Sequence, residues 1–299
     1  MTTNNRKSIC RILDRVSALL DIKNEKSRSS IALLAIGIFL VGLIFSFRRL
    51  DASIAWRLSA AILLGMLALL CLTFLINTLR THTHSRIVGA QLSLGDNAKI
   101  SLFASAMNML PMIIPAGMAM RMSNFVRHGG DAKLVVGVLV TNYLLALLSS
   151  LLLGIAMLAS NSFAQLQIPL VLIAFIYIGV AALFIRLSGL KAGLGIALLE
   201  LSAVIVDAIR IYICFGILSF SIEYFQAAIL TVSAVLGSAV SIVPAGLGVR
   251  EIVGAMISPL IEVVPEQTFL AIALNRVFGI LFFVGLSGLV LFIDRSKQR

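Results

Sequence analysis

The pattern P-A-G-x-x-x-R occurs twice in this 299-residue chain, from Pro115 to Arg121 and from Pro244 to Arg250. Proline ends a helix and glycine permits a sharp turn, so each pattern frees backbone N–H and C=O groups. Freed N–H groups at the start of the next helix attract anions, and an arginine one turn later adds a planar fork suited to phosphate or carboxylate. Two such elements predict a site for one anionic group. The alternative for each is a helix kink whose arginine extends to the interface.

The similarity of the two segments extends beyond the shared pattern. They read "SAMNMLPMIIPAGMAMR" and "SAVSIVPAGLGVR", and the isolated Asn142 and Asn275 follow them at equivalent places. The first segment needs four extra residues for this alignment, and in so apolar a chain a chance match is the alternative. Only the second arginine is followed by an acidic residue: Glu251 follows Arg250, whereas Met122 follows Arg121. The predicted binding residues are Asn108, Pro115, Gly117, Arg121, Asn142, Pro244, Gly246, Gly248, Arg250, Glu251, Asn275 and Arg276.

Glu200, Asp207 and Arg210 form a second group of charges inside an apolar run. Their spacing places all three on one face of a helix. Ionisable residues inside a membrane face partners or a water-filled cavity. Asp207 and Arg210 could simply neutralise each other, and Glu200 could lie at the interface. Otherwise the carboxylates balance Arg250 or Arg276, or accept a proton during transport, which makes this group a gating or charge-balancing element.

Other chemistry lacks a recognisable motif. The sequence contains no nucleophile–base pair, no phosphate-binding glycine loop and no zinc motif, so neither a cofactor nor enzymatic activity is expected. His82 and His84 lie in "THTH", in a segment expected to be a basic loop, and without further ligands they do not predict a metal site. The three cysteines have no redox or metal spacing and are expected to be packing residues.

The composition indicates a membrane protein. Hydrophobic residues make up 60% of the chain and charged residues 12%, which is about half the charged share of an ordinary soluble domain. Uncharged runs recur at the length that crosses a hydrocarbon core as a helix. The net charge of +11 lies in short segments between these runs, a pattern that orients membrane spans and does not indicate nucleic-acid binding. An all-α integral membrane protein is predicted.

The apolar runs predict about six full transmembrane helices, at 31–47, 54–76, 134–158, 168–186, 193–219 and 268–293. Two further apolar regions, 100–120 and 225–262, are interrupted by proline and glycine. Lysine and arginine concentrate in 1–30, 77–99, 127–133, around 186–191 and in the tail, so these segments are predicted to be cytoplasmic. The segment 48–57 is a basic exception on the predicted outer side.

This charge distribution requires each interrupted region to return to the side from which it started. The prediction is therefore six spans plus two re-entrant hairpins, with both termini cytoplasmic. Three spans and one hairpin form each half, so the halves are inverted repeats, a transporter design. The first repeat is 31–160 and the second 161–294, followed by a tail at 295–299. Residues 1–30 are either an amphipathic interfacial helix or a loosely ordered basic leader.

"PAGLGVRE" at 244–251, between two apolar runs, resembles the signature of the lysylphosphatidylglycerol synthase transmembrane-region family, the flippase-like domain proteins. Residues 108–121 are similar to that family's first-half motif, and the resemblance covers about 30–295. Met118 and Ala119 depart from it, because members often carry an acidic residue there. The resemblance implies a membrane domain that handles lipids, in some members moving an aminoacylated phospholipid between leaflets. Because the chain ends at "DRSKQR", lipid synthesis by this chain alone is not expected.

The leading hypothesis is a lipid translocase, or a lipid-binding transporter-like protein, of the cytoplasmic (inner) membrane. Its ligand would be an anionic phospholipid or a lipid-linked glycan, held between the two hairpins, with Glu251, Asp207 and Arg210 completing or gating the site. One alternative is a non-transporting accessory subunit of a lipid-modifying enzyme or glycosyltransferase. Another is a membrane-embedded transferase with Asp207 or Glu251 as base.

Overall fold

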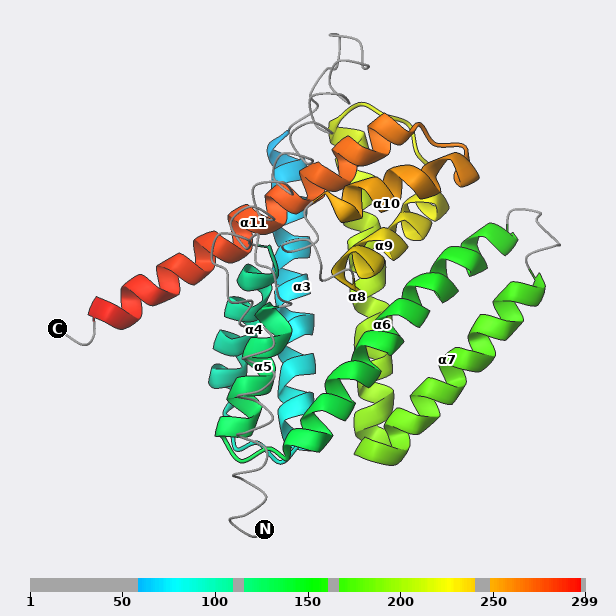
Figure 1. Cartoon of the computed structure of the whole chain (residues 1–299). Coiled ribbons are helices and arrows are strands. Elements are labelled where there is room, and N and C mark those ends of the chain that lie inside the picture. Colours follow the sequence, from blue (N-terminus) through cyan, green and yellow to red (C-terminus); the bar gives the residue numbers. More distant parts are fainter. Residues whose placement is uncertain (1–58, 110–115, 161–166, 240–247, 297–299) are drawn as a thin grey trace, which may run out of the picture.

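A computed structural model describes residues 59–109, 116–160, 167–239 and 248–296 of the chain (Figure 1). Every regular element in these ranges is helical, which confirms the all-α class for the described part. The elements are α3 (Ala60–Ile87), α4 (Leu94–Met109), α5 (Ala116–Arg127), α6 (Ala132–Ser160), α7 (Gln167–Ser188), α8 (Leu190–Ile217), α9 (Tyr224–Ala239), α10 (Val249–Ile257), the 3-10 turn η3 (Ser258–Ile261) and α11 (Pro265–Ser296). The predicted leader, the predicted span at 31–47, Pro115, Pro244 and Gly246 lie outside the described residues.

Among the described residues, four helices are long and apolar enough to cross a membrane, and they support the membrane class. They comprise Ala60–Ile87, Ala132–Gly154, Leu190–Ile217 and Pro265–Asp294. Large apolar side chains cover their outer faces; Leu64 is 66% exposed and Phe292 is 73% exposed. In water such surfaces would be unfavourable, whereas lipid chains cover them without penalty. Helix α7 occupies the predicted span at 168–186.

The prediction that 77–99 is a loop is wrong, whereas its predicted cytoplasmic side stays a prediction. Helix α3 continues to Ile87, and only a short turn separates it from α4. The polar residues that pointed to a loop are instead buried by packing: Thr81 and His84 are at most 1% exposed. The Thr81 hydroxyl donates to the Asn77 carbonyl at 2.7 Å, so this buried hydroxyl has a hydrogen-bond partner. His84 therefore lies on a helix.

Helices α4 and α5 form a hairpin that returns to the end of the molecule where it begins. The turn before α4 and the turn after α5 are hydrogen-bonded to each other, since Gln91 N donates to the His128 carbonyl at 3.0 Å and Asp131 N to the Val88 carbonyl at 3.2 Å. Figure 1 shows both turns at the lower end of the bundle, beside the α7–α8 turn. The basic segments at 127–133 and 186–191 therefore share one end.

Helices α9 and α10 form a second hairpin, which begins and ends near the opposite end of the bundle (Figure 1). The Gln226 side chain, at the start of α9, donates from Nε2 to the carbonyl of Ile261, just after α10, at 2.7 Å. In each hairpin the interruption, at 110–115 and 240–247, lies outside the described residues. The described arms are short: 16 residues in α4 and in α9 correspond to about 24 Å of helix, less than a hydrocarbon core.

Gly117 allows the two arms of the first hairpin to touch. A Cβ at this position would overlap the Ala104 carbonyl oxygen and the Asn108 side chain. The glycine N–H, in the first turn of α5, donates to Asn108 Oδ1 at 3.0 Å. Asn108 thus satisfies an N-terminal donor of α5 from the neighbouring helix, in the manner of an N-cap.

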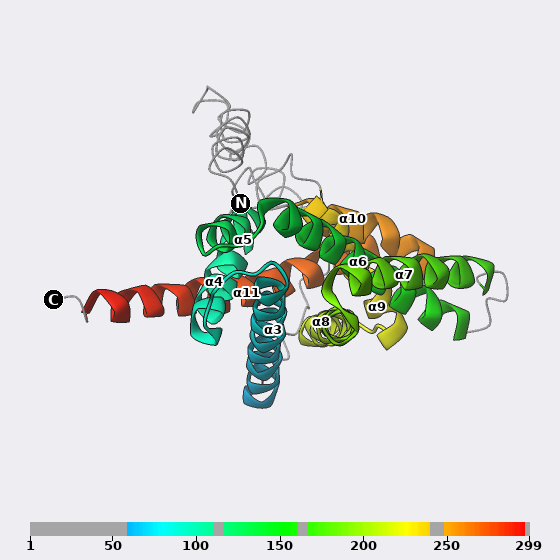
Figure 2. The ribbon, with the colours of Figure 1, turned by 90° about the horizontal axis from the view of Figure 1, so that it is seen from below.

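Helix α8 lies at the centre of the bundle. It packs against α3, α6, α7, α9 and α11, and Figure 2 shows it end-on between α3 and the α6–α7 pair. The larger apolar core joins α8, α9 and α11 to α3 and α4, and includes the fully buried Phe215, Leu230 and Ala271. A smaller core joins α5, α6, α7 and α8 around Phe125 and Phe184. The carboxyl-terminal part of α11 extends beyond this packing in both views.

Replacing Gly117 with alanine tests the close contact in the first hairpin. Gly117→Ala should lower the free energy of unfolding by about 1–3 kcal/mol, because the added methyl group forces the two arms apart. Thermal melting of the purified protein in detergent measures the effect. Gly137→Ala is the control, since nothing lies within 4 Å of a Cβ built there and alanine favours a helix. Equal melting of the two variants would contradict the described packing.

Candidate functional site

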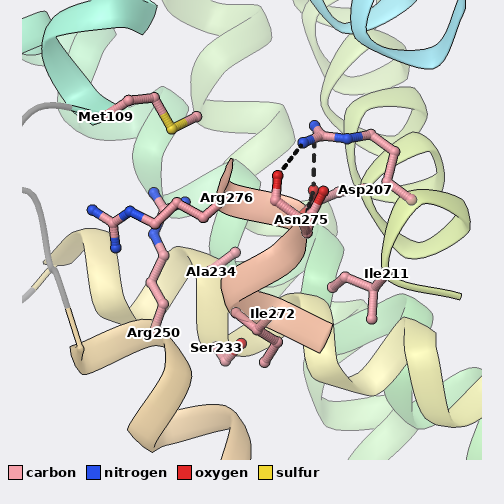
Figure 3. A pocket seen from close by; sticks show the side chains of 10 residues that line it. Met109, Asp207, Ile211, Ser233, Ala234, Arg250, Ile272, Asn275 and Arg276 are labelled. Carbon is pink, nitrogen blue, oxygen red and sulfur yellow. Dashed lines mark hydrogen bonds and ion pairs between the residues drawn. The ribbon is translucent and has the colours of Figure 1, made fainter. Parts of the chain in front are cut away.

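A small polar cavity lies among α4, α8, α9, α10 and α11. Its volume is about 50 Å³, enough for a few ordered water molecules. Figure 3 shows Met109 on one side of the cavity, Asp207 and Ile211 on another, and Arg250 and Arg276 together on a third. The lining residues are Met109, Asp207, Arg210, Ile211, Ser233, Ala234, Arg250, Ile272, Asn275 and Arg276. The cavity therefore brings together five predicted site residues from the second half with Met109 from the first hairpin.

Asp207 and Arg210 of α8 form one wall and are linked to α11. Arg210 Nη1 lies 3.6 Å from Asp207 Oδ1, which confirms the mutual neutralisation considered for this pair. Asp207 Oδ1 also accepts from Asn275 Nδ2 at 3.3 Å, and Arg210 Nη2 donates to the Asn275 carbonyl at 3.4 Å (Figure 3). The side chain of Arg210 is 6% exposed and that of Asp207 is 27% exposed, so the carboxylate retains access to the cavity.

Glu251 and Arg276 form a buried ion pair behind this wall. Arg276 Nη1 lies 3.4 Å from Glu251 Oε1, and the two side chains are 4% and 0% exposed. The short helix α10 that carries Glu251 starts after Gly248, whose φ of 81° is a conformation that suits glycine. Gly248 thus sets the direction of the chain entering α10, and α10 then places Arg250 at the cavity and Glu251 against α11.

Charged groups of both signs surround the cavity. Three guanidinium groups, from Arg210, Arg250 and Arg276, stand against the carboxylates of Asp207 and Glu251. Arg250 and Arg276 make further interactions within the protein. The side-chain oxygen Oδ1 of Asn275 is buried without a hydrogen-bond partner. The guanidinium groups can hold an anion, and the Asn275 oxygen can accept a hydrogen bond from that anion or from a water molecule.

The structure does not bring Arg121 to this cavity. Arg121 lies instead in a second polar group, where the nearby charges acting on it are Arg80 and Glu200. Glu200 is 1% exposed and lies 2.5 Å from Arg80 Nη1, so it is buried and does not balance Arg250 or Arg276. Asn142 lies in this second group, beside His84. The predicted convergence of Arg121 and Arg250 on one anion thus differs from the described arrangement, which has two separate clusters.

One backbone amide that was expected to be free at the first hairpin is not free. The Gly117 N–H is already bonded to Asn108 Oδ1, so it is not available to an anion in this conformation. The corresponding part of the second hairpin, including Pro244 and Gly246, lies outside the described residues. The side chains, rather than the backbone amides, therefore carry the described site.

Sequence reasoning missed two residues that matter here. Arg80 was assigned to a loop, although its partner Glu200 lies 120 positions away and could not be paired with it from spacing. Met109 was overlooked because a methionine in an apolar run carries no signal of its own. Its side chain packs on Gly279 of α11, where a Cβ would lie 3.2 Å from Met109 Cε. For metals, no group of three His, Cys, Asp or Glu residues is found in the part of the chain that the structure describes.

Glu251→Gln tests the buried ion pair. It should lower the free energy of unfolding by about 3–5 kcal/mol, because Arg276 keeps its charge in a buried position. The double variant Glu251→Gln with Arg276→Met should be less destabilised than Glu251→Gln alone, as measured by melting in detergent. The control is the exposed pair Lys99–Asp294 at 2.7 Å, where Lys99→Met should change stability by about 1 kcal/mol or less. Additive effects at Glu251 and Arg276 would contradict the pair.

Comparison with known proteins does not place the chain in a family. No protein-family model matches it, and no curated protein matches it by sequence. The functional conclusion therefore depends on the geometry and charge of the two clusters.

Proposed function

We propose that the protein is a lipid translocase, or a lipid-binding transporter-like protein, that holds an anionic head group at the cavity between its two hairpins. The observation that carries this proposal is the convergence of three guanidinium groups, from Arg210, Arg250 and Arg276, on one cavity among apolar, membrane-length helices. Cations in such surroundings are rare and face partners, a ligand or a water-filled cavity. The phosphate group of a lipid is an anion that can enter a cavity between membrane helices while the acyl chains of the lipid remain in the bilayer.

The lining supports a head group that carries both a phosphate and hydroxyl or amine groups. Arg250 and Arg276 lie on the same side of the cavity (Figure 3), and guanidinium groups match the geometry of phosphate oxygens. The unpartnered oxygen of Asn275 and the accessible carboxylate of Asp207 are acceptors. An anionic phospholipid and a lipid-linked glycan both combine these features. The shared chemistry is a phosphodiester next to hydrogen-bond donors.

The cavity must widen before it accepts a head group. Its volume of about 50 Å³ suits water rather than a phospholipid head group. Met109 closes it from the first hairpin, and a methionine side chain can change rotamer with little loss of packing. Movement of α4 relative to α11 would open the site to one side. The described conformation is therefore a closed state in this proposal.

The topology in this proposal is the inverted repeat, in the inner membrane and with both termini in the cytoplasm. Its support is that each hairpin begins and ends at the same end of the bundle, and that the two hairpins use opposite ends. The turn at 128–131 is then cytoplasmic, and the turn at 218–223 is outside. The end that contains 127–133 and 186–191 is basic, as expected for a cytoplasmic face.

Cysteine labelling tests this orientation. His128→Cys should react with a membrane-impermeant maleimide only after the cells are permeabilised, whereas Glu223→Cys should react in intact cells. Both variants would be made in a chain in which Cys10, Cys71 and Cys214 are replaced by serine. Labelling of His128→Cys in intact cells would overturn the topology.

Head-group exposure in reconstituted vesicles tests the activity. After a quencher is added outside vesicles that contain fluorescent phosphatidylglycerol, the fluorescence should fall faster when the wild-type protein is present. Arg250→Ala should slow this process about tenfold or more, because one charge-assisted hydrogen bond contributes about 1.5–3 kcal/mol. Arg127→Ala is the matched control, since Arg127 is an exposed guanidinium at the end of α5.

Equal rates in wild type and Arg250→Ala would remove Arg250 from the site. If neither phosphatidylglycerol nor a lipid-linked glycan moved, the translocase would be excluded. If the protein is instead an accessory subunit of a membrane enzyme, neither lipid should be translocated and the enzyme should co-purify with the protein. Deletion of the protein would then abolish that enzyme's activity and leave the lipid distribution normal.

A further inference from the structure

The cluster around His84 is a second, separate group of buried polar side chains. His84 of α3 is 1% exposed and Asn142 of α6 is 9% exposed. Arg80 and Arg121 act on the His84 ring electrostatically, and Asn142 lies beside it. Glu200 of α8 is the one acidic member in the described residues. Four helices, α3, α5, α6 and α8, thus contribute to the cluster.

The cluster has an excess positive charge. Arg80 is already engaged, since its Nη1 contacts Glu200 Oε1 at 2.5 Å and its Nη2 donates to Asn77 Oδ1 at 2.6 Å. Glu200 is therefore neutralised by Arg80. Arg121, by contrast, has no hydrogen bond or ion pair within the described residues, and its Nε is buried without a partner. One guanidinium charge in this cluster therefore has no counter-ion of its own among the residues that the structure describes.

The cluster also contains an unpartnered acceptor. A neutral imidazole donates through one ring nitrogen and accepts through the other. In the described part of the chain, neither nitrogen of His84 has a hydrogen-bond partner of good geometry, and the Asn142 oxygen is likewise without one. If the ring turns to donate to the adjacent Asn142 oxygen, the second ring nitrogen still lacks a donor. At least one buried acceptor therefore remains beside the guanidinium donors.

This combination defines the chemistry of a ligand. Donors at Arg80 Nε and Arg121 Nε, both buried and unpartnered, need an oxygen that carries negative charge. The acceptor at His84 or Asn142 needs an O–H group on the same ligand. Inorganic phosphate carries both at pH 7, because it keeps at least one O–H in both its singly and doubly charged forms. A phosphate monoester carries both in its singly charged form, which the site would have to select because the second pKa of a monoester is about 6. Sulfate and phosphodiesters carry the negative charge but no O–H on the anionic centre.

We infer that the His84–Arg121 cluster is a binding site for a hydroxyl-bearing oxyanion, either hydrogen phosphate or the phosphate monoester of a lipid. The site is distinct from the cavity at Arg250, whose proposed ligand is a phosphodiester head group. Arg121 supplies the compensating charge, and Arg80 donates while it holds Glu200. His84, oriented by Asn142, selects for the hydroxyl group.

Equilibrium dialysis of the purified full chain with radioactive inorganic phosphate at pH 7 tests the site. Phosphate should bind saturably, and arsenate, which also carries a hydroxyl group, should displace it. Sulfate at equal ionic strength should compete at least about tenfold more weakly, because the buried acceptor would face an oxygen without a proton. This comparison uses the wild-type protein alone, so it does not depend on the folding of any variant.

Two substitutions then assign the binding to this cluster. Arg121→Ala should weaken phosphate binding about tenfold or more, and Asn142→Asp should do the same by placing a carboxylate of nearly the same shape beside the anion. Arg127→Ala is the control and should change the dissociation constant for phosphate by no more than about twofold, because Arg127 lies on the same helix but outside the cluster. Unchanged gel-filtration profiles and melting of the variants ensure that a loss of binding reflects the site.

Competing lipids in mixed micelles identify the source of the anion. Displacement of phosphate by phosphatidic acid, a monoester, but not by phosphatidylmethanol, a diester without hydroxyl groups, would assign the site to a lipid monoester. Displacement by neither lipid would assign it to the inorganic ion. The inference is overturned if phosphate does not bind, if sulfate or phosphatidylmethanol competes as well as phosphate does, or if Arg121→Ala binds normally. Because Arg250 takes no part, the translocation assay can fail while this site stands.

Discussion

The structure depends on one constraint: a charge placed among apolar helices must find a compensating partner inside the protein. Helix α8 supplies much of that compensation. Glu200 and Asp207 lie on one face of it, seven residues apart, which corresponds to about 10 Å along the helix axis. Glu200 neutralises Arg80 of α3, and Asp207 neutralises Arg210 and accepts from Asn275 of α11. The central position of α8 thus follows from its charges as well as from its apolar faces.

The two hairpins contribute cations to this central helix from opposite ends. Arg121 on α5 comes within the electrostatic range of Glu200, and Arg250 on α10 lines the cavity with Asp207. In both places several guanidinium groups gather around a carboxylate of α8, Arg80 and Arg121 near Glu200 and Arg210 and Arg250 near Asp207. Ionisable groups are costly among membrane helices and face partners or polar cavities. The carboxylates of α8 therefore determine where the arginines of both hairpins can lie.

Local patterns in the sequence were enough to predict the helical class of the described part and to offer the pairing of Asp207 with Arg210 as an alternative, because helix periodicity acts over a few residues. The predicted interruptions fall at 110–115 and 240–247, outside the described residues. Long-range contacts were not predictable in this way. Arg80 and Glu200 are 120 positions apart, and without that pairing a polar segment such as "RTHTHSR" is typical of a loop. Gly117 was singled out for its turn, but its close contact with Asn108 depends on how α4 and α5 pack. The division of the arginines into two clusters likewise follows from the arrangement of helices in space.

The difference between the hairpins has a mechanical consequence. The second hairpin carries its own acidic residue, Glu251, which is buried against Arg276 and ties α10 to α11. The first hairpin has Met122 at the corresponding position, and the acid nearest its arginine is Glu200 of α8, which Arg80 already holds. Moving α10 away from α11 would break a buried ion pair, whereas moving α5 relative to α8 would break none within the described residues. Moving α4 away from α11 would break the Lys99–Asp294 pair, which is exposed and contributes about 1 kcal/mol or less. The first hairpin is therefore the less tightly held of the two. Because Met109 at its inner end closes the cavity, a shift of that hairpin is the least costly way to open the site.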